Sequence, residues 1–162
     1  MACRGVFFAL DEEQITRIQS ANDDDELMGV IEEIEEAWDV DFLVECDKSW
    51  DAMHRVLADG TLDWNAGDYP LNQVVLGEPS LHKDPSYIVC FKDVACVRDV
   101  TSAIRGVDRS QFESWYYTKA KDYAPEYGEE DCGYTWDNFE DVRKLYETAS
   151  QAGRSVIFTV DQ

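Results

Sequence analysis

The chain has 162 residues with 35 acidic and 14 basic side chains, which give a formal net charge of -21 at pH 7. A field of this sign repels nucleic-acid phosphates and anionic membrane surfaces and attracts cations and basic proteins, so nucleic-acid and membrane partners are disfavoured. The excess is concentrated in residues 1–68, which hold 19 acidic and 4 basic side chains. With 44% hydrophobic and 12% aromatic residues, the composition is that of a folded domain rather than of an acidic disordered segment.

One domain spanning residues 1–162 is expected, because this length supports a hydrophobic core without disulfides or metals. No apolar run approaches 18 residues, so no transmembrane helix is expected, and the apolar stretch at residues 6–10 is too short for a signal peptide. The five cysteines are widely spaced and form no CxxC pair, which argues against a disulfide framework and a zinc site. We therefore expect a cytoplasmic protein with reduced thiols, no metal and no cofactor.

The N-terminal part begins with a predicted strand at residues 4–10 and a short helix at residues 11–20. A strongly acidic helix from Asn22 to Trp38 follows, with Asn22 as the expected N-cap. Its apolar residues fall on one helical stripe, formed by Leu27, Val30, Ile31, Ile34 and Trp38. The remaining positions carry eight carboxylates and no basic residue. The helix must therefore be stabilised by docking its stripe rather than by ion pairs along its surface.

The rest of the chain alternates between helices and short strands. Further strands are predicted at residues 40–46, 87–91 and 155–160. Further helices are predicted at residues 48–58, 94–105, 110–123 and 136–151. Residues 71–76 are a short buried strand or helical turn, and residues 125–133 are read as an acidic loop. Because strands lie near both ends of the chain with helices between them, we expect an α+β domain with a small mixed sheet packed by amphipathic helices.

The segment Asp47-Lys48-Ser49-Trp50, with His54 four residues after the tryptophan, directly follows the acidic region. Other short blocks stand out before and after it in the chain. They are Cys3-Arg4-Gly5, Pro70-Leu71, Leu76-Gly77-Glu78-Pro79, the aromatic helix and Ala152-Gly153. Over nearly its whole length the chain resembles the YfbM-like family of bacterial domains of unknown function. This resemblance implies a single α+β domain and no established activity. By motif position, it implies that Asp47, Trp50, His54 and Glu78 are the residues to examine.

Two interpretations of His54 remain open. On a helix, Trp50 and His54 share one face, and Asp47 lies one turn before the tryptophan. In a pocket, His54 is a candidate general base that Asp47 or Glu78 orients. Alternatively, Asp47 caps the helix, Trp50 and His54 face the core, and His54 donates a hydrogen bond to a loop carbonyl.

Other catalytic chemistry has weaker support in the sequence. Cys132 is the cysteine that its surroundings predict to be most exposed, but the preceding Glu129-Glu130-Asp131 raises its pKa, which is unfavourable for a nucleophile. The spacing of histidines, cysteines and carboxylates matches no zinc or EF-hand signature. No phosphate-binding glycine loop and no GxSxG motif occurs.

The acidic helix offers a candidate binding surface. Glu32, Glu33, Glu35 and Glu36 form a face without basic neighbours, which is either simply solvated or a docking surface for a basic protein. A cationic partner would relieve the repulsion among these carboxylates and associate faster. Aromatic side chains that can act as anchors in such an interface are Trp50, Trp64, Tyr69 and Tyr127.

We therefore predict an acidic cytoplasmic interaction protein, of which an immunity-type inhibitor that binds a basic protein is the most concrete form. The alternative is an enzyme, a hydrolase or transferase of unknown substrate, with a pocket around His54. The sequence leaves the identity of the partner and the oligomeric state open.

Overall fold

The computed structural model describes residues 3–120 and 123–162, with the backbone alone for residues 124–127. The described residues form four strands, six α-helices and one 3-10 helix. The strands are β1 (Gly5–Leu10), β2 (Leu43–Asp47), β3 (Tyr87–Lys92) and β4 (Ser155–Asp161). The helices are α1 (Glu12–Ser20), α2 (Asp24–Ala37), α3 (Trp50–Leu57), the 3-10 helix η1 (Leu71–Gln73), α4 (Val94–Arg105), α5 (Arg109–Thr118) and α6 (Ala124–Ala152). The chain thus has the expected α+β fold.

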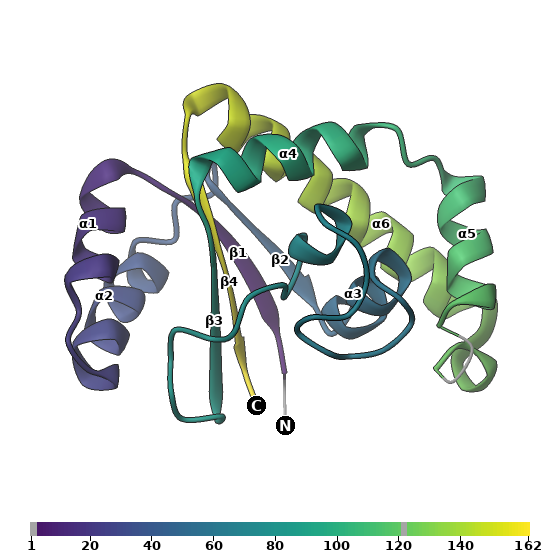
Figure 1. Cartoon of the computed structure of the whole chain (residues 1–162), viewed down its shortest axis with the longest axis horizontal. Coiled ribbons are helices and arrows are strands. Elements are labelled where there is room, and N and C mark those ends of the chain that lie inside the picture. The colour runs from purple at the N-terminus through teal and green to yellow at the C-terminus, as the bar shows by residue number, and fades with distance from the viewer. Residues whose placement is uncertain (1–2, 121–122) are drawn as a thin grey trace.

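The four strands form one sheet in the order β2-β1-β4-β3. All three pairings are antiparallel. The sheet is therefore purely antiparallel, whereas a mixed sheet was expected from the sequence. The first and last strands of the chain, β1 and β4, lie together at its centre. The sheet is covered on both faces: α1 and α2 lie on one side, and α3 to α6 lie on the other (Figure 1).

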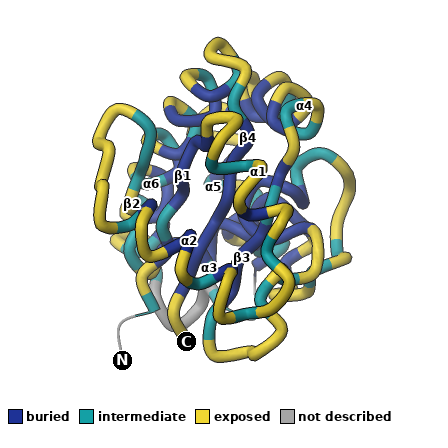
Figure 2. The backbone as a smooth tube through the Cα atoms, turned by 90° about the vertical axis from the view of Figure 1, so that its left-hand side faces the viewer, coloured by how far each residue is buried: buried dark blue, intermediate teal, exposed yellow. Residues whose placement is uncertain are grey.

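The smaller core lies between the sheet and the pair α1–α2. Leu27, Val30, Ile31 and Ile34 of α2 are buried there against strand residues such as Phe8. Seen from this side, the strands behind the two helices are buried, whereas the outer turns of the helices are exposed (Figure 2). The docked stripe is therefore what holds the acidic helix in place, as the spacing predicts.

Both ends of α2 differ from the prediction. The N-cap is Asp23, whose carboxylate accepts a hydrogen bond from the Glu26 amide, and Asn22 instead donates to the side chain of Glu26. At the other end, Trp38 is the C-cap in the left-handed region, with φ 42°. The change of backbone direction removes Trp38 from the buried stripe, and its side chain is 42% exposed.

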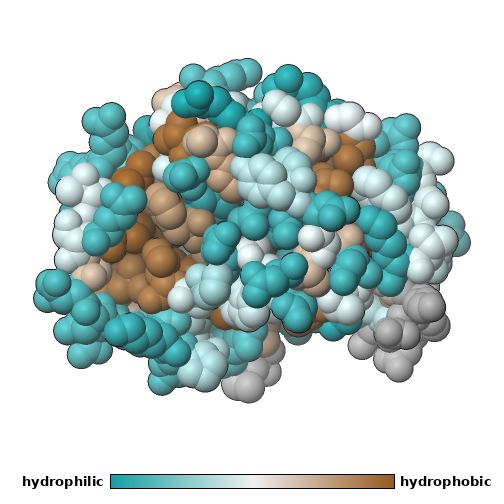
Figure 3. All heavy atoms as spheres, in the orientation of Figure 1, coloured by the Kyte–Doolittle hydropathy of each residue, from teal (hydrophilic) through white to brown (hydrophobic). Residues whose placement is uncertain are grey.

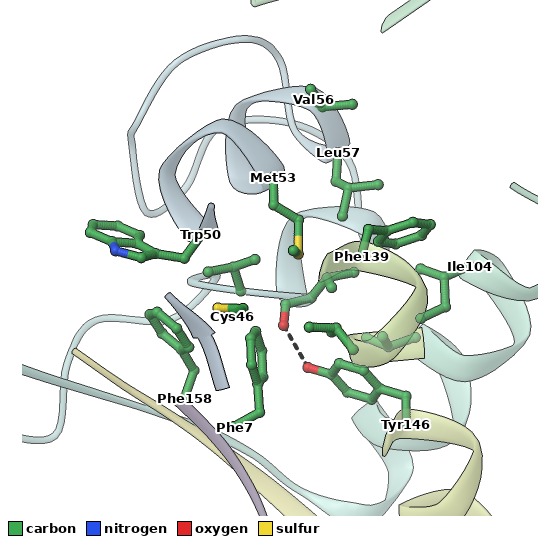
Figure 4. Packing of buried hydrophobic residues seen from close by; sticks show 14 of the residues in the cluster. Phe7, Cys46, Trp50, Met53, Val56, Leu57, Ile104, Phe139, Tyr146 and Phe158 are labelled. Atoms are coloured by element: carbon green, nitrogen blue, oxygen red, sulfur yellow. Dashed lines mark hydrogen bonds between the residues drawn. The ribbon is translucent and has the colours of Figure 1, made fainter. Parts of the chain in front are cut away.

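The larger core lies on the opposite face of the sheet. Because successive strand residues point to opposite faces, Phe7 faces this core while Phe8 faces the smaller one. The rings of Phe7 and Phe158 lie 4.8 Å apart, and the Tyr146 hydroxyl donates to the Val74 carbonyl at 2.6 Å (Figure 4). Helix α3 closes one end of this core with Met53 and neighbouring apolar residues.

The predicted acidic loop at residues 125–133 is wrong, because α6 (Ala124–Ala152) covers this segment as two helical stretches that meet at a kink. A proline in the first turn is compatible with a helix, and the kink that separates the two stretches lies at Gly128, with φ 67° and ψ -157°. Cys132, predicted to be exposed, is only 2% exposed, and burial raises the pKa of its thiol to about 11. Asp131 accepts a hydrogen bond from the Tyr116 hydroxyl at 2.6 Å, which fixes this part of α6 to α5.

Candidate functional site: a pocket with two tryptophans

A cavity of about 560 Å³ lies at the end of the sheet where the chain termini emerge. Two segments without regular structure, 61–68 and 79–86, form much of its wall. Its lining is mostly apolar and aromatic, and consists of Trp50, Leu62, Trp64, Leu76, Pro79, Ser80, His82, Lys83, Pro85, Tyr87, Ile88 and Gln162. We name it the two-tryptophan pocket. An apolar concave surface with a few polar groups is the usual form of a binding site.

Trp50 provides a rigid wall of this pocket. It is the first residue of α3, and the preceding Ser49 fixes the turn by donating its hydroxyl hydrogen to the Cys46 carbonyl at 2.6 Å. The indole Nε1 donates to the Cys3 carbonyl at 2.9 Å, and the ring lies 5.8 Å from that of Phe158 (Figure 4). Because its donor is satisfied and the residue is only 5% exposed, Trp50 is a fixed part of the pocket wall and presents little surface of its own to a ligand.

The acidic helix supports the opposite wall. The carboxylate of Asp24 accepts hydrogen bonds from the amides of Lys83 at 3.0 Å and Asp84 at 3.2 Å, and these bonds lower the pKa of Asp24. Further along α2, Glu35 accepts a hydrogen bond from the Tyr87 hydroxyl. Burial, together with this bond, raises the pKa of Tyr87. Two carboxylates of α2 thus hold segment 79–87 in position beside the pocket.

The surroundings of the pocket are acidic. Asp63, Asp84 and Asp161 are exposed, and each is adjacent in sequence to a residue of the lining. Lys83 contributes a basic group at the rim and also lines a second hollow of about 380 Å³. That hollow lies between the α1–α2 pair and the sheet edge, where Figure 3 shows apolar atoms gathered beside α2. Apolar surface is therefore present on both sides of segment 79–87.

His54 lies in the larger core rather than on a pocket wall. Its side chain is 1% exposed, and Nε2 is 3.0 Å from the Asp63 carbonyl, as in the second of the two interpretations above. Nδ1 is buried and has no hydrogen-bond partner in the described part of the chain. Burial lowers the pKa of His54, so the neutral imidazole is favoured.

Asp47 and Glu78, the other candidate catalytic residues, are not bonded to His54 in residues 3–120 and 123–162. Asp47 accepts a hydrogen bond from the Tyr134 hydroxyl at 2.7 Å and lies 3.7 Å from Arg4. It does not cap α3, because the N-cap position is occupied by Ser49. Glu78 is exposed and lines a different cavity. The structure therefore does not assemble these three residues around one reacting position.

The predicted binding residues are divided among several places. Trp50 and Trp64 meet in the two-tryptophan pocket. Tyr69 lies outside it, with its hydroxyl donating to Asp99 at 2.6 Å, and the side chain of Tyr127 is outside the described residues. On α2, Glu33 pairs with Arg17 at 2.5 Å and Glu35 with Tyr87. Glu32 and Glu36 are solvent-exposed, and we find no ion pair for either in the part of the chain that the structure describes.

Several residues of the pocket were not identified from the sequence, among them Pro79, Pro85, Tyr87 and Gln162. Only the turn-forming prolines gave a local signal, and it indicated chain reversal rather than binding. Within the described ranges, no three or more His, Cys, Asp or Glu side chains are arranged to hold a metal ion. The described helices include none that is long and apolar enough to cross a membrane.

An antiparallel sheet between two helical layers, with an aromatic pocket at one end, defines the chain as an acidic α+β domain. It belongs to the family described as a domain of unknown function, DUF1877, whose model matches residues 1–159. Its fold is similar to that of YfbM from Escherichia coli, a protein of unknown function, with a TM-score of 0.69 and 19% identity over 99% of each chain. The resemblance to YfbM-like domains is thereby confirmed. No curated protein matches the sequence.

Proposed function

We propose that this domain is an interaction protein that binds a basic protein partner through the two-tryptophan pocket. The observation that carries the proposal is the convergence of Trp50 and Trp64 on one apolar cavity of about 560 Å³ at an acidic surface. Aromatic side chains in a preformed apolar pocket are typical of the energetic centre of protein interfaces. The expected occupant is an aromatic or aliphatic side chain of the partner.

The charge of the domain predicts which residues the partner carries beside its apolar side chain. Asp63, Asp84 and Asp161 are exposed and adjacent in sequence to lining residues, and the whole chain has a net charge of -21. Complementarity therefore requires Lys or Arg on the partner beside its apolar anchor. Long-range attraction to Glu32 and Glu36 would raise the association rate more than it lowers the dissociation rate.

A test of this proposal is site-specific photocrosslinking in the cells that make the protein. A photoreactive amino acid is placed at Leu62, an exposed residue of the pocket lining, and in a second sample at Tyr117, an exposed residue of α5. The proposal expects one basic protein to be crosslinked in stoichiometric amount from Leu62 and not from Tyr117. An acidic partner, or equal crosslinking from both positions, would contradict it.

Matched variants then separate the pocket from general surface effects. Trp64→Ala should weaken binding by a factor of about 30 or more, as expected for a central aromatic anchor. Trp38→Ala removes an exposed tryptophan outside the pocket lining and should leave the affinity nearly unchanged. Reversal of Glu32 and Glu36 to Lys should mainly slow association, with a difference that disappears at high salt.

A further inference from the structure

Lys92 is a buried lysine without a carboxylate partner. It is the last residue of β3, and its side chain is only 1% exposed. Nζ donates a hydrogen bond to the Val75 carbonyl and lies 5.8 Å from the centre of the Phe158 ring. In the described residues no Asp or Glu forms an ion pair with this ammonium group. Burial of a charged amine without a counter-ion is unfavourable and shifts the group toward its neutral form.

The neutral form of a lysine is a nucleophile. Burial lowers the pKa of Lys92 from 10.5 to about 8. A substantial fraction of the amine is then unprotonated near neutral pH, whereas a lysine in water remains almost entirely charged. Lysines in such desolvated positions react with carbonyl compounds.

A cavity of about 420 Å³ adjoins this residue. Lys92 is part of its lining together with Tyr69, Gln73, Glu78, Phe91, Asp93, Ala95 and Cys96. Four of the lining residues, Tyr69, Glu78, Asp93 and Ala95, are exposed and lie at its mouth. The two carboxylates and the net charge of -21 oppose the entry of anions, including carboxylated or phosphorylated carbonyl compounds.

We propose that this cavity admits a small, uncharged aldehyde or ketone, which Lys92 captures as a Schiff base. The Nζ lone pair attacks the carbonyl carbon and forms a C–N bond, the π bond of the carbonyl breaks toward oxygen, and the oxygen takes up a proton that the nitrogen releases. The resulting carbinolamine loses its oxygen as water, which carries both amine hydrogens with it, and a C=N bond remains. No electrons are transferred, so no oxidant or reductant is needed. This site is separate from the two-tryptophan pocket and does not depend on the proposed partner.

The full chain is tested with butanal as an uncharged aldehyde, in the presence of cyanoborohydride, which reduces a Schiff base to a stable secondary amine. Peptide mass spectrometry measures labelling at Lys92 and at the exposed Lys48, Lys83 and Lys144. We expect Lys92 to be labelled at least about tenfold faster than the exposed lysines at pH 7.5, because a larger fraction of it is neutral. Glyoxylate, an anionic aldehyde, should show no such preference for Lys92.

Blocking the cavity mouth tests whether the cavity is the route. Ala95→Phe places a large side chain on an exposed helical position at the mouth and should reduce labelling of Lys92 about tenfold or more. Ala37→Phe, at an exposed position of α2, is the matched control and should have no effect. Labelling of Lys92 no faster than that of the exposed lysines would overturn the proposal, as would full labelling in Ala95→Phe.

Discussion

The hydroxyl of Tyr87 donates a hydrogen bond to the carboxylate of Glu35, and this contact attaches the wall of the two-tryptophan pocket to the acidic helix α2. The contact gives one carboxylate of that helix a structural role. Glu35 is therefore distinct from its neighbours Glu32 and Glu36, which face solvent.

Replacement of Tyr87 by Phe removes only the hydroxyl. We expect the free energy of unfolding to fall by about 1–3 kcal/mol, the usual range for a hydrogen bond to a charged acceptor. Affinity for the proposed partner should fall as well, because the pocket wall loses a fixed position. Denaturant unfolding measures the first effect. Tyr69→Phe breaks a bond between exposed side chains and should cost less, so equal losses in the two variants would contradict this role of Tyr87.

The carboxylates in the C-terminal half of α2 should be unfavourable for its stability, in contrast to those that cap its N-terminus. Its last turn contains no basic residue and lies at the negative end of the helix dipole. Glu32→Gln combined with Glu36→Gln should therefore raise the melting temperature slightly at low salt, by a change in free energy of a few tenths of a kcal/mol, roughly 0.3–0.6. Ile31→Ala, in the buried stripe, should cost about 2–5 kcal/mol. Thermal unfolding at two salt concentrations distinguishes the two effects. Salt screens the repulsion among carboxylates but not the loss of packing in Ile31→Ala.

His54 should make stability depend on pH. Burial lowers the pKa of the folded imidazole below its ordinary value of 6.5. Below pH 6.5 the unfolded chain therefore binds more protons than the folded one, so stability is lost as pH falls through this region, by up to about 1.4 kcal/mol per pH unit. Urea unfolding between pH 5 and 8 should show this slope in the unmodified chain and in His82→Gln, but not in His54→Gln. A slope retained in His54→Gln would assign it to other groups.

Lys92 should make the stability of the protein depend on pH in the alkaline range. Its folded pKa is about 8, against an ordinary value of 10.5, so between these values the unfolded chain binds the extra proton and stability rises with pH. Relative to Lys92→Met, the unmodified chain should gain about 3 kcal/mol from pH 8 to pH 10.5. The comparison of the two proteins cancels the titration of cysteines and tyrosines that do not interact with Lys92, whereas Cys90 and Cys96, which do, contribute to the difference. A constant difference would mean that the buried amine keeps its ordinary pKa.

Two glycines with positive φ should tolerate alanine to different extents. At Gly60, φ is 96° and an added Cβ would lie 2.0 Å from the Lys119 carbonyl oxygen. At Gly153, φ is 66° and no atom lies within 4 Å of an added Cβ. Gly153→Ala should therefore cost only the conformational penalty, about 1 kcal/mol. Gly60→Ala should cost several times more, as denaturant unfolding would show.

Local patterns predicted most of the secondary structure. The spacing of Leu27, Val30, Ile31 and Ile34 located α2 and its buried face, but periodicity contains no information on where the helix ends, so Trp38 was wrongly added to the stripe. In residues 125–133, proline and glycine indicated a loop. The segment is instead helical on both sides of a kink at Gly128, and after the kink Asp131 and Cys132 contact neighbouring elements, which are not visible in a local window.

The candidate sites could be predicted only in part. Trp50 and Trp64 were identified one by one as binding residues, but their meeting with Tyr87 and Gln162 depends on how distant segments cross the end of the sheet. The burial of Lys92 could not be predicted either. A lysine after an apolar strand is typical of a strand end in solvent, and here segment 70–79 covers it.

The position of β4 between β1 and β3 has a consequence for synthesis on the ribosome. The pairing of Phe7 with Phe158 joins residues that lie far apart in the chain and are therefore translated at different times. Until residues 155–161 are available, β3 has no partner in the described sheet, whereas β1 can already pair with β2 and contact the apolar stripe of α2. The strongly acidic N-terminal part can therefore begin to pack before the sheet is complete, and the mutual repulsion of its carboxylates helps to keep the incomplete sheet from aggregating during that interval.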